Sequence, residues 1–318
     1  MDIGEFRKLI ERLQSLTPDQ RRQVVERVRR VDKQQEILSL LEKRLAKDPT
    51  CPRCGDNRVG RWGTHSKLQR YRCRECGATF NALTGTPLAR LRHKDKWLTY
   101  AQTMVEGKSV RKAAELCGVH RNTTFRWRHR FLSLVETEKP ERLTGIVEAD
   151  ETFFRESFKG QKRGMARPAR KRGTKAKKRG TSEEYKPVLI IRDRSGSTRE
   201  EILRSTRTEE IARALKPVVS RDAILCADGG AAYRLFAEAE GITLKAVNLS
   251  AGIRVVERVF HIQNVNAYHS RLKNWMRRFH GVATRHLSIY LGWRRLIERE
   301  VRILSPQTLI LAAQGANN

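Results

Sequence analysis

Two aspartates in this sequence stand where side chains could bind divalent metal ions. Asp150 ends a predicted strand at residues 145–150, and Asp228 ends another at residues 223–228. From neighbouring strand ends, two carboxylates can hold a pair of Mg²⁺ or Mn²⁺ ions about 3.5–4 Å apart, which clamp the attacking and leaving oxygens of a phosphodiester. Both are therefore candidate catalytic ligands, although an acid at a strand end is weak support when it stands alone.

A later predicted helix carries further polar side chains. Asn266 and Lys273 are seven residues apart, which is about two turns, so they lie near one face of that helix. The amide oxygen of Asn266 can coordinate Mg²⁺, but it brings no negative charge and cannot act as a base. Glu148 or Glu151 could supply the missing charge. Because neighbours along a strand point to opposite faces, at most one of Asp150 and Glu151 faces the metals.

Four cysteines form two Cys-x-x-Cys pairs that are separated by eighteen residues. This spacing is typical of a four-cysteine zinc site, and Zn–S bonds of about 2.3 Å would close a tetrahedron with no open position. We therefore expect one structural zinc ion in a zinc ribbon, with a redox dithiol as the competing interpretation. The predicted zinc ligands are Cys51, Cys54, Cys73 and Cys76.

The net charge of +31 on 318 residues indicates an anionic polymer as partner, and nucleic acid is the commonest such polymer. The sequence has no run of about 18 apolar residues that could span a membrane, and its first residues lack the layout of a signal peptide. We therefore expect a cytoplasmic protein with no membrane partner, acting at the nucleoid. In the cytoplasm its thiols stay reduced and serve as ligands or core residues.

Residues 109–130 show the anatomy of a helix-turn-helix. Ser109 is a predicted N-cap, and Gly118 marks the turn. In this motif the N-terminal residues of the second helix reach base edges in the major groove of double-stranded DNA. A plain helical hairpin is the competing interpretation. The candidate DNA contacts are Arg121, Asn122, Thr123, Arg126 and Arg128.

A basic insertion at residues 159–180 interrupts the second half of the chain. It holds eleven Lys or Arg and no acid in twenty-two positions, a composition that cannot enter a core. Because such charges release counterions when they meet phosphate, we expect this insertion to contact DNA, with a merely solvated loop as the alternative. Its candidate DNA contacts are Lys171, Arg172, Lys177 and Lys178.

The modules follow one another in a multidomain α+β chain. Residues 1–48 read as helices, which could serve dimerisation or DNA docking, although the pattern favours a helical hairpin packed on its neighbour. The zinc ribbon would span residues 49–82 and the helix-turn-helix domain residues 90–136. Strands that alternate with helices then predict a mixed α/β domain at residues 143–300.

In this order the modules resemble a known family. The ribbon and helix-turn-helix are followed by Val-Glu-Ala-Asp-Glu-Thr (147–152), Ala-Asp-Gly-Gly (227–230) and Asn-Val-Asn-Ala-Tyr-His-Ser-Arg-Leu-Lys (264–273). This is similar to bacterial insertion-sequence transposases of the DDE superfamily, in the ISXO-like group. The resemblance covers residues 50 to about 300 and implies an RNase H-like catalytic domain with a mixed sheet flanked by helices.

The resemblance also implies roles for individual residues. Asp150 and Asp228 match the two aspartate places, Asn266 stands where glutamate is common, and Lys273 matches the basic residue seven positions later. Asparagine occupies this third place in some members of the group. The implied enzyme binds the element ends, hydrolyses a phosphodiester at each end with Mg²⁺ or Mn²⁺, and uses the freed 3′-hydroxyl to attack target DNA. Joining two ends implies a homo-oligomer on DNA.

Two other functions are consistent with these residues. A catalytically silent DNA-binding regulator, or a transposase that has decayed at Asn266, would explain the DNA-binding modules but not the aspartates at two separate strand ends. A structure-specific nuclease on the same fold would cut branched DNA without joining ends.

Overall fold

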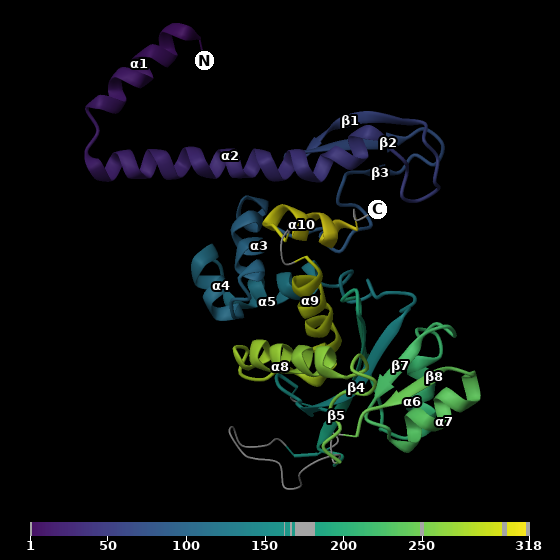
Figure 1. The fold of residues 1–318 in the computed structure, drawn as a ribbon. Coiled ribbons are helices and arrows are strands. Elements are labelled where there is room, and N and C mark those ends of the chain that lie inside the picture. The colour runs from purple at the N-terminus through teal and green to yellow at the C-terminus, as the bar shows by residue number, and fades with distance from the viewer. Residues whose placement is uncertain are drawn as a thin grey trace. The chain divides into compact units, whose positions relative to one another are not determined.

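The computed structural model describes residues 2–161, 163–165, 167–168, 182–248, 251–300 and 304–315, which Figure 1 draws as a ribbon. Contacts divide the chain into two units, Met1–Phe131 with Ser305–Asn318, and Leu132–Leu304. None of the described helices is both long and apolar enough to cross a bilayer.

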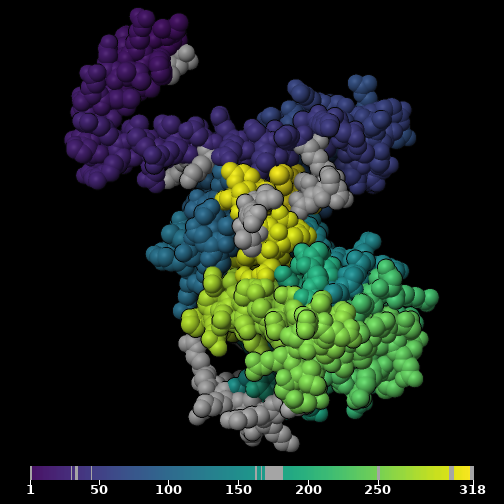
Figure 2. Space-filling model, in the orientation of Figure 1, coloured from purple at the N-terminus to yellow at the C-terminus, as the bar shows by residue number. Residues whose placement is uncertain are grey.

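The first unit begins with two helices, α1 (Ile3–Gln14) and α2 (Pro18–Lys47). A capping box starts α2, because the Thr17 N–H donates to Gln20 Oε1 at 2.9 Å and the Gln20 N–H donates to Thr17 Oγ1 at 3.3 Å. α1 buries no residue, and no other segment covers its visible face in Figure 2. Only the C-terminal part of α2 packs on the rest of the unit, so the predicted hairpin packing is wrong for α1.

A small antiparallel sheet of three strands follows, in the order β1-β2-β3. Its hairpin turns at Ser66 and Lys67, both with positive φ, as the two-residue turns of tight hairpins require. Tyr71 and Phe80 stack with their ring centroids 5.8 Å apart and form the apolar centre of the module with two cysteines. The strands are β1 Val59–His65, β2 Leu68–Cys73 and β3 Thr79–Phe80.

The predicted helix-turn-helix lies in a bundle of short helices. Ser109 caps its first helix by accepting the Lys112 N–H, and Gly118 ends that helix in the left-handed region at φ 56°. The C-terminal helix α10 packs against α2, α3 and α5, which the sequence did not predict. The helices are η1 Lys94–Lys96, α3 Trp97–Val105, α4 Val110–Cys117, α5 Arg121–Phe131 and α10 Pro306–Gln314.

The second unit is built on a five-stranded sheet with the order β6-β5-β4-β7-β8. β4 pairs antiparallel with β5 and β5 antiparallel with β6, whereas β4 with β7 and β7 with β8 are parallel pairs. β6 and β8 were not predicted. The strands are β4 Ile146–Arg155, β5 Tyr185–Asp193, β6 Thr198–Ile202, β7 Ile224–Ala227 and β8 Thr243–Ala246.

Strand β4 is longer than predicted. Its pairing with β5 continues to Arg155, so Asp150 lies near the middle of the strand and not at its end. Its pairing with β7 stops after Glu148. Beyond that point β4 has no strand beside it on this edge, which leaves room next to Asp150 for the residues that follow β7.

Helices cover both faces of this sheet (Figure 1). Odd-numbered residues of β4, including Val147 and Ala149, join the core that α6 and α7 complete with Ile211 and Phe236. On the other face α8 packs against β4 and β5, and α9 packs against β6. These helices are α6 Thr208–Leu215, α7 Ala231–Glu240, α8 Gln263–Arg277, η2 Thr284–His286 and α9 Leu287–Arg299.

A buried polar network fixes α8 and α9 on the sheet. Glu200 of β6 accepts a hydrogen bond from the Tyr268 hydroxyl of α8 and forms an ion pair with Arg295 of α9. Arg295 also donates to the carbonyl oxygens of Val135 and Glu138 at 3.2 Å. Because buried charges are tolerated only when they are paired and hydrogen-bonded, this network allows little change in the position of α8.

Candidate active site

The two aspartates lie near one another, just beyond the pairing of β4 with β7. The last pair of this parallel register is Glu148 with Cys226. Asp150 in β4 and Asp228, the residue after β7, each lie two residues beyond that pair. Together with Glu151 they line one cavity of about 660 Å³. The structure therefore brings together two carboxylates that are far apart in the sequence.

Three of the four acids that line this cavity, Asp150, Glu151 and Asp228, lie close enough for their charges to interact. Burial, followed by the negative charges of Glu151 and Asp228, raises the pKa of Asp150 from 3.8 to about 7, against the opposing charge of Lys273. Burial also raises the pKa of Glu151, against the hydrogen bond that the Tyr233 hydroxyl donates to its Oε1 at 2.7 Å. A divalent cation would relieve this repulsion, and carboxylate oxygens are the ligands that hard metal ions take. Among the described residues, however, these three acids do not form a group whose ligand atoms all lie close together.

This pKa predicts how the stability of the protein depends on pH. Between about pH 4 and pH 7 the folded state keeps a proton on Asp150 that the unfolded state has lost, because the folded pKa is about 7 and the ordinary value is 3.8. Its contribution to the free energy of unfolding is therefore complete below about pH 4 and disappears as the pH rises through 7. Without added Mg²⁺ or Mn²⁺, the midpoint of thermal unfolding should fall across this window more in the parent than in Asp150→Asn. If the unfolding midpoints of the parent and Asp150→Asn fell equally across this window, the raised pKa of Asp150 would be contradicted.

One face of α8 is turned toward Asp150. His269 is 7% exposed, and its Nδ1 lies 3.6 Å from Asp150 Oδ2. Burial, and then the charge of Lys273, lowers the pKa of His269 to about 4, so the ring is neutral at pH 7. Asn266 and Lys273 share this face because they lie three residues before and four residues after His269. His269 was not predicted as a site residue, although its helical spacing from Asn266 and Lys273 was a usable signal.

Asn266 is half-buried, and it is not among the described residues that line the cavity of Asp150 and Asp228. Its side-chain amide makes no hydrogen bond to another residue in the described parts of the chain. The structure thus sets the helix face of Asn266 toward Asp150 without joining the three proposed ligands in one contact network.

Glu148 has a structural role and not the ligand role considered for it. It is fully buried, and its oxygens accept the side-chain N–H of Asn264 at 2.8 Å and the backbone N–H of Val265 at 3.0 Å. Arg194 and His261 lie 3.4 and 3.5 Å from its Oε1. A carboxylate at a helix N-terminus satisfies unpaired backbone donors, so Glu148 fixes the start of α8 two residues from Asp150.

The four predicted zinc ligands gather in the ribbon. Their sulfur atoms all lie within 4.8 Å of one another, with Cys51 and Cys76 at 3.7 Å and Cys54 and Cys73 at 3.6 Å. A tetrahedron with Zn–S bonds of about 2.3 Å has edges of roughly 3.8 Å. The cluster therefore fits one zinc ion with no position left for substrate.

Comparison with known proteins identifies the family. Residues 142–294 match the model of the ISXO2-like transposase domain, and residues 91–143 match a homeodomain-like domain. An uncharacterized protein in transposable element ISH50 of Halobacterium salinarum is 31% identical over 248 residues, covering 76% of this chain and 82% of that protein. The chain belongs to the insertion-sequence transposases of the DDE superfamily. This confirms the resemblance inferred from the motifs and establishes a DNA transposase.

Two solved structures are similar to this transposase. A pre-cleavage Mos1 transpososome is 13% identical with a TM-score of 0.22, covering 67% of this chain and 77% of that chain. A Mos1 transposase paired-end complex with the left transposon end is 14% identical with a TM-score of 0.20, covering 68% and 78% of the two chains. Neither TM-score is high enough to define a shared arrangement.

The DNA-binding residues predicted for the transposase fall into three groups. Arg121, Asn122 and Arg126 are exposed on α5, and Thr123 is half-buried there. Arg128 is 1% exposed, and its Nη2 donates to the Lys108 carbonyl oxygen at 2.7 Å, so its prediction as a DNA contact is wrong. The four predicted contacts of the basic insertion lie outside the described residues: Lys171, Arg172, Lys177 and Lys178.

Proposed function

We propose that Asp150 and Asp228 are the metal-binding catalytic residues of this transposase. The observation that carries the proposal is that these two residues line the same cavity, together with the raised pKa of Asp150, to which the charge of Asp228 contributes. Asn266 would add a neutral third ligand from α8, and Lys273, which is exposed on the same face, would contact a DNA phosphate. Two Mg²⁺ or Mn²⁺ ions would, when bound, activate the nucleophile and stabilise the leaving oxygen.

An RNase H-like fold is part of this proposal. Numbered within the second unit, the strand order β6-β5-β4-β7-β8 reads 3-2-1-4-5, and the second strand is antiparallel to its neighbours. This order supports the placement of one aspartate on the first strand and the other after the fourth. We extend it to a catalytic domain at residues 143–300, preceded by the helical segment 1–48, the ribbon 49–82 and the helix-turn-helix domain 90–136.

The residues of the chain would divide the reaction between them. The carboxylates of Asp150 and Asp228 would hold the ions, which would supply the Lewis-acid chemistry, and His269 packs against Asp150 to fix its orientation. Water would be the first nucleophile and the freed 3′-hydroxyl the second, so no covalent protein intermediate is needed. The exposed N-terminal residues of α5 and the basic insertion would hold the element ends and the target DNA. The ribbon would bind one structural zinc ion, and the protein would act as a homo-oligomer on DNA.

The direct test uses the purified protein and labelled duplexes that carry the inverted repeats flanking its reading frame. With Mg²⁺ or Mn²⁺ we expect strand cleavage at the repeat boundary and joined products with target DNA, and neither product without a divalent ion. Binding without cleavage would instead indicate a catalytically silent regulator. Cleavage of branched DNA without joined products would indicate a nuclease.

A further inference from the structure

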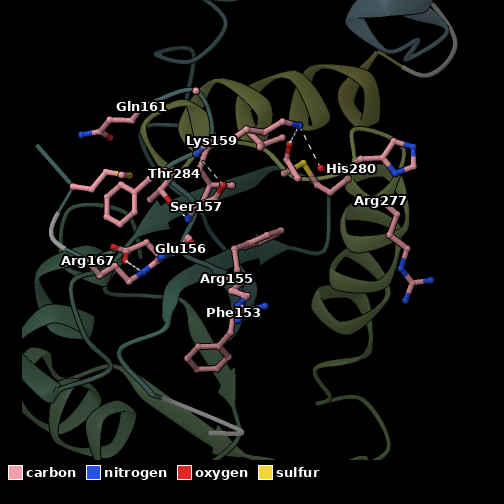
Figure 3. A pocket seen from close by; sticks show the side chains of 18 of the residues that line it. Phe153, Arg155, Glu156, Ser157, Lys159, Gln161, Arg167, Arg277, His280 and Thr284 are labelled. Carbon is pink, nitrogen blue, oxygen red and sulfur yellow. Dashed lines mark hydrogen bonds and ion pairs between the residues drawn. The ribbon is translucent and has the colours of Figure 1, made fainter. Parts of the chain in front are cut away.

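A second cavity, of about 790 Å³, lies in the same unit as the aspartates. One wall is the end of β4 with the segment that follows it, and the other is the C-terminal half of α8 with the loop that leads to α9 (Figure 3). Its volume is within the range of about 300–1,000 Å³ that is usual for sites of small organic ligands. None of the functions proposed above uses it.

The two walls are tied together, so the cavity is a built feature of the fold. Ser157 and Thr284 face each other in Figure 3, where the Ser157 N–H donates to Thr284 Oγ1 at 2.8 Å and the Thr284 N–H donates to the Ser157 carbonyl at 2.8 Å. Lys159 Nζ donates to the carbonyl oxygens of Gly281 at 2.8 Å and His280 at 3.3 Å, just after α8 ends. These bonds fix both walls whether or not a ligand is present.

The lining combines an apolar interior with positive charge. Three phenylalanines line it, Phe153, Phe154 and Phe158, with Met276 and Leu287. The basic lining residues are Arg155, Lys159, Arg167, Lys273 and Arg277. Glu156 is the one carboxylate among the described lining residues, and it is already paired with Arg167 at 3.6 Å and Lys186 at 3.2 Å. The cavity therefore suits a flat apolar group that carries a negative charge.

Two residues connect this cavity with the aspartates. Phe153 lines both cavities, and Lys273 lines this one while its charge acts on Asp150. His269, Lys273 and Arg277 follow one another at four-residue steps on α8, so they form one stripe along the helix. The stripe runs about 12 Å from His269 to Arg277 at 1.5 Å per residue. That length corresponds to about three nucleotide steps of a DNA strand at 3.4 Å each.

We propose that this cavity takes up one unpaired nucleotide of the transposon end, within about three nucleotides of the scissile phosphodiester. Its base would stack on the ring of Phe158, which already carries the Arg167 guanidinium 4.9 Å from its centroid. Its phosphates would meet Lys273 and Arg277. Enzymes that open a duplex commonly hold a displaced base against aromatic side chains, and such stacking tolerates any base sequence. The inference rests on the proposed catalytic role of Asp150 and Asp228, because that role sets where the strand is cut.

The experiment places 2-aminopurine, which neighbouring bases quench and which brightens when it leaves the base stack of the duplex, at successive positions around the cleavage site of an end duplex. The full chain is added with Ca²⁺, so that binding is measured without relying on cleavage. We expect the fluorescence to rise at one position, to stay low there with Phe158→Ala, and to rise again with Phe158→Tyr. Phe158→Ala should bind the end roughly 5- to 150-fold more weakly, the usual loss when one base stack is removed.

Two controls separate stacking from folding. Phe260 is another phenylalanine with a cation over its ring, because Lys245 Nζ lies 5.1 Å from the ring centroid. Phe260 lies outside the cavity, so Phe260→Ala should leave the fluorescence rise intact. An abasic site at the responsive position has no base to stack, so the parent and Phe158→Ala should then bind equally.

The proposal would be overturned if the fluorescence still rose in Phe158→Ala. It would also be overturned if the parent protein cleaved the end duplex but the fluorescence rose at no position. A Phe158-dependent rise in a protein that never cleaves would instead contradict only the catalytic assignment.

Discussion

Replacing Asp150 or Asp228 with asparagine will lower the rate of strand cleavage at the element end by roughly 1,000-fold or more. Each change removes a negative charge from the cavity while keeping the side-chain shape, so ion binding is lost and the fold is kept. Removing a single group that stabilises transition-state charge already costs about 100- to 1,000-fold in other enzymes, and a metal ligand acts on both reacting oxygens. The measurement is the single-turnover rate of cleavage of a labelled end duplex in Mg²⁺.

The matched control is Glu238→Gln, which removes one charge from the exposed face of α7 and should cleave at the parental rate. End binding, measured by gel shift in the absence of divalent ions, should be unchanged in all three variants. If Asp150→Asn or Asp228→Asn cleaved at the parental rate, the assigned site would be wrong. If binding fell together with cleavage, the change would have damaged the DNA-binding surface or the fold.

Loss of the four proposed zinc ligands is expected to unfold the ribbon. The buried cluster of this module contains only Tyr71 and Phe80 besides Cys51 and Cys73, so little apolar surface is available to stabilise it without metal. Structural zinc binding contributes about 10–16 kcal/mol in small zinc-dependent modules. In Cys51→Ser we expect zinc to fall from one ion per chain toward none, and proteases to cut between residues 49 and 82 while the second unit stays intact.

Cys117→Ser is the control for this prediction. Cys117 is a buried thiol outside the cluster, and burial raises its pKa to about 11. This variant should keep one zinc ion per chain and a protected ribbon. A Cys51→Ser protein that retained its zinc and its protease resistance would show that the module does not depend on the metal.

Local signals in the sequence predicted several elements closely. The sequence predicts helices at residues 208–215 and 231–240, and α6 and α7 begin and end there, because an apolar helical stripe bounded by turn residues is specified locally. β6 was missed because Thr198-Arg-Glu-Glu-Ile202 is mostly polar. Pairing with β5 and the partners of Glu200 hold it as a strand, and these partners lie far away in the sequence.

The candidate site, too, could be predicted only where local sequence patterns specify it. The aspartates could be predicted because each lies in or directly after an apolar strand, but the length of β4 depends on its pairing with β5. Arg128 looked like a DNA contact since it lies between exposed arginines, whereas the fold turns it inward to the Lys108 carbonyl. His269 and the helix-fixing role of Glu148 required the packing of α8 on the sheet, which no local pattern encodes.

The return of α10 to the first unit affects how the protein is made. Leu309, Ile310 and Ala313 of α10 are buried there, and Gln314 Nε2 donates to the carbonyl oxygens of Leu41 and Ala82 at 2.9 Å. The ribosome synthesises these residues after the whole second unit, so a nascent chain carries an uncovered apolar surface until translation reaches them. A chain that ends before Ser305 would therefore lack α10, the last helix to pack on the first unit. DNA binding by that unit would then depend on synthesis of the full-length chain.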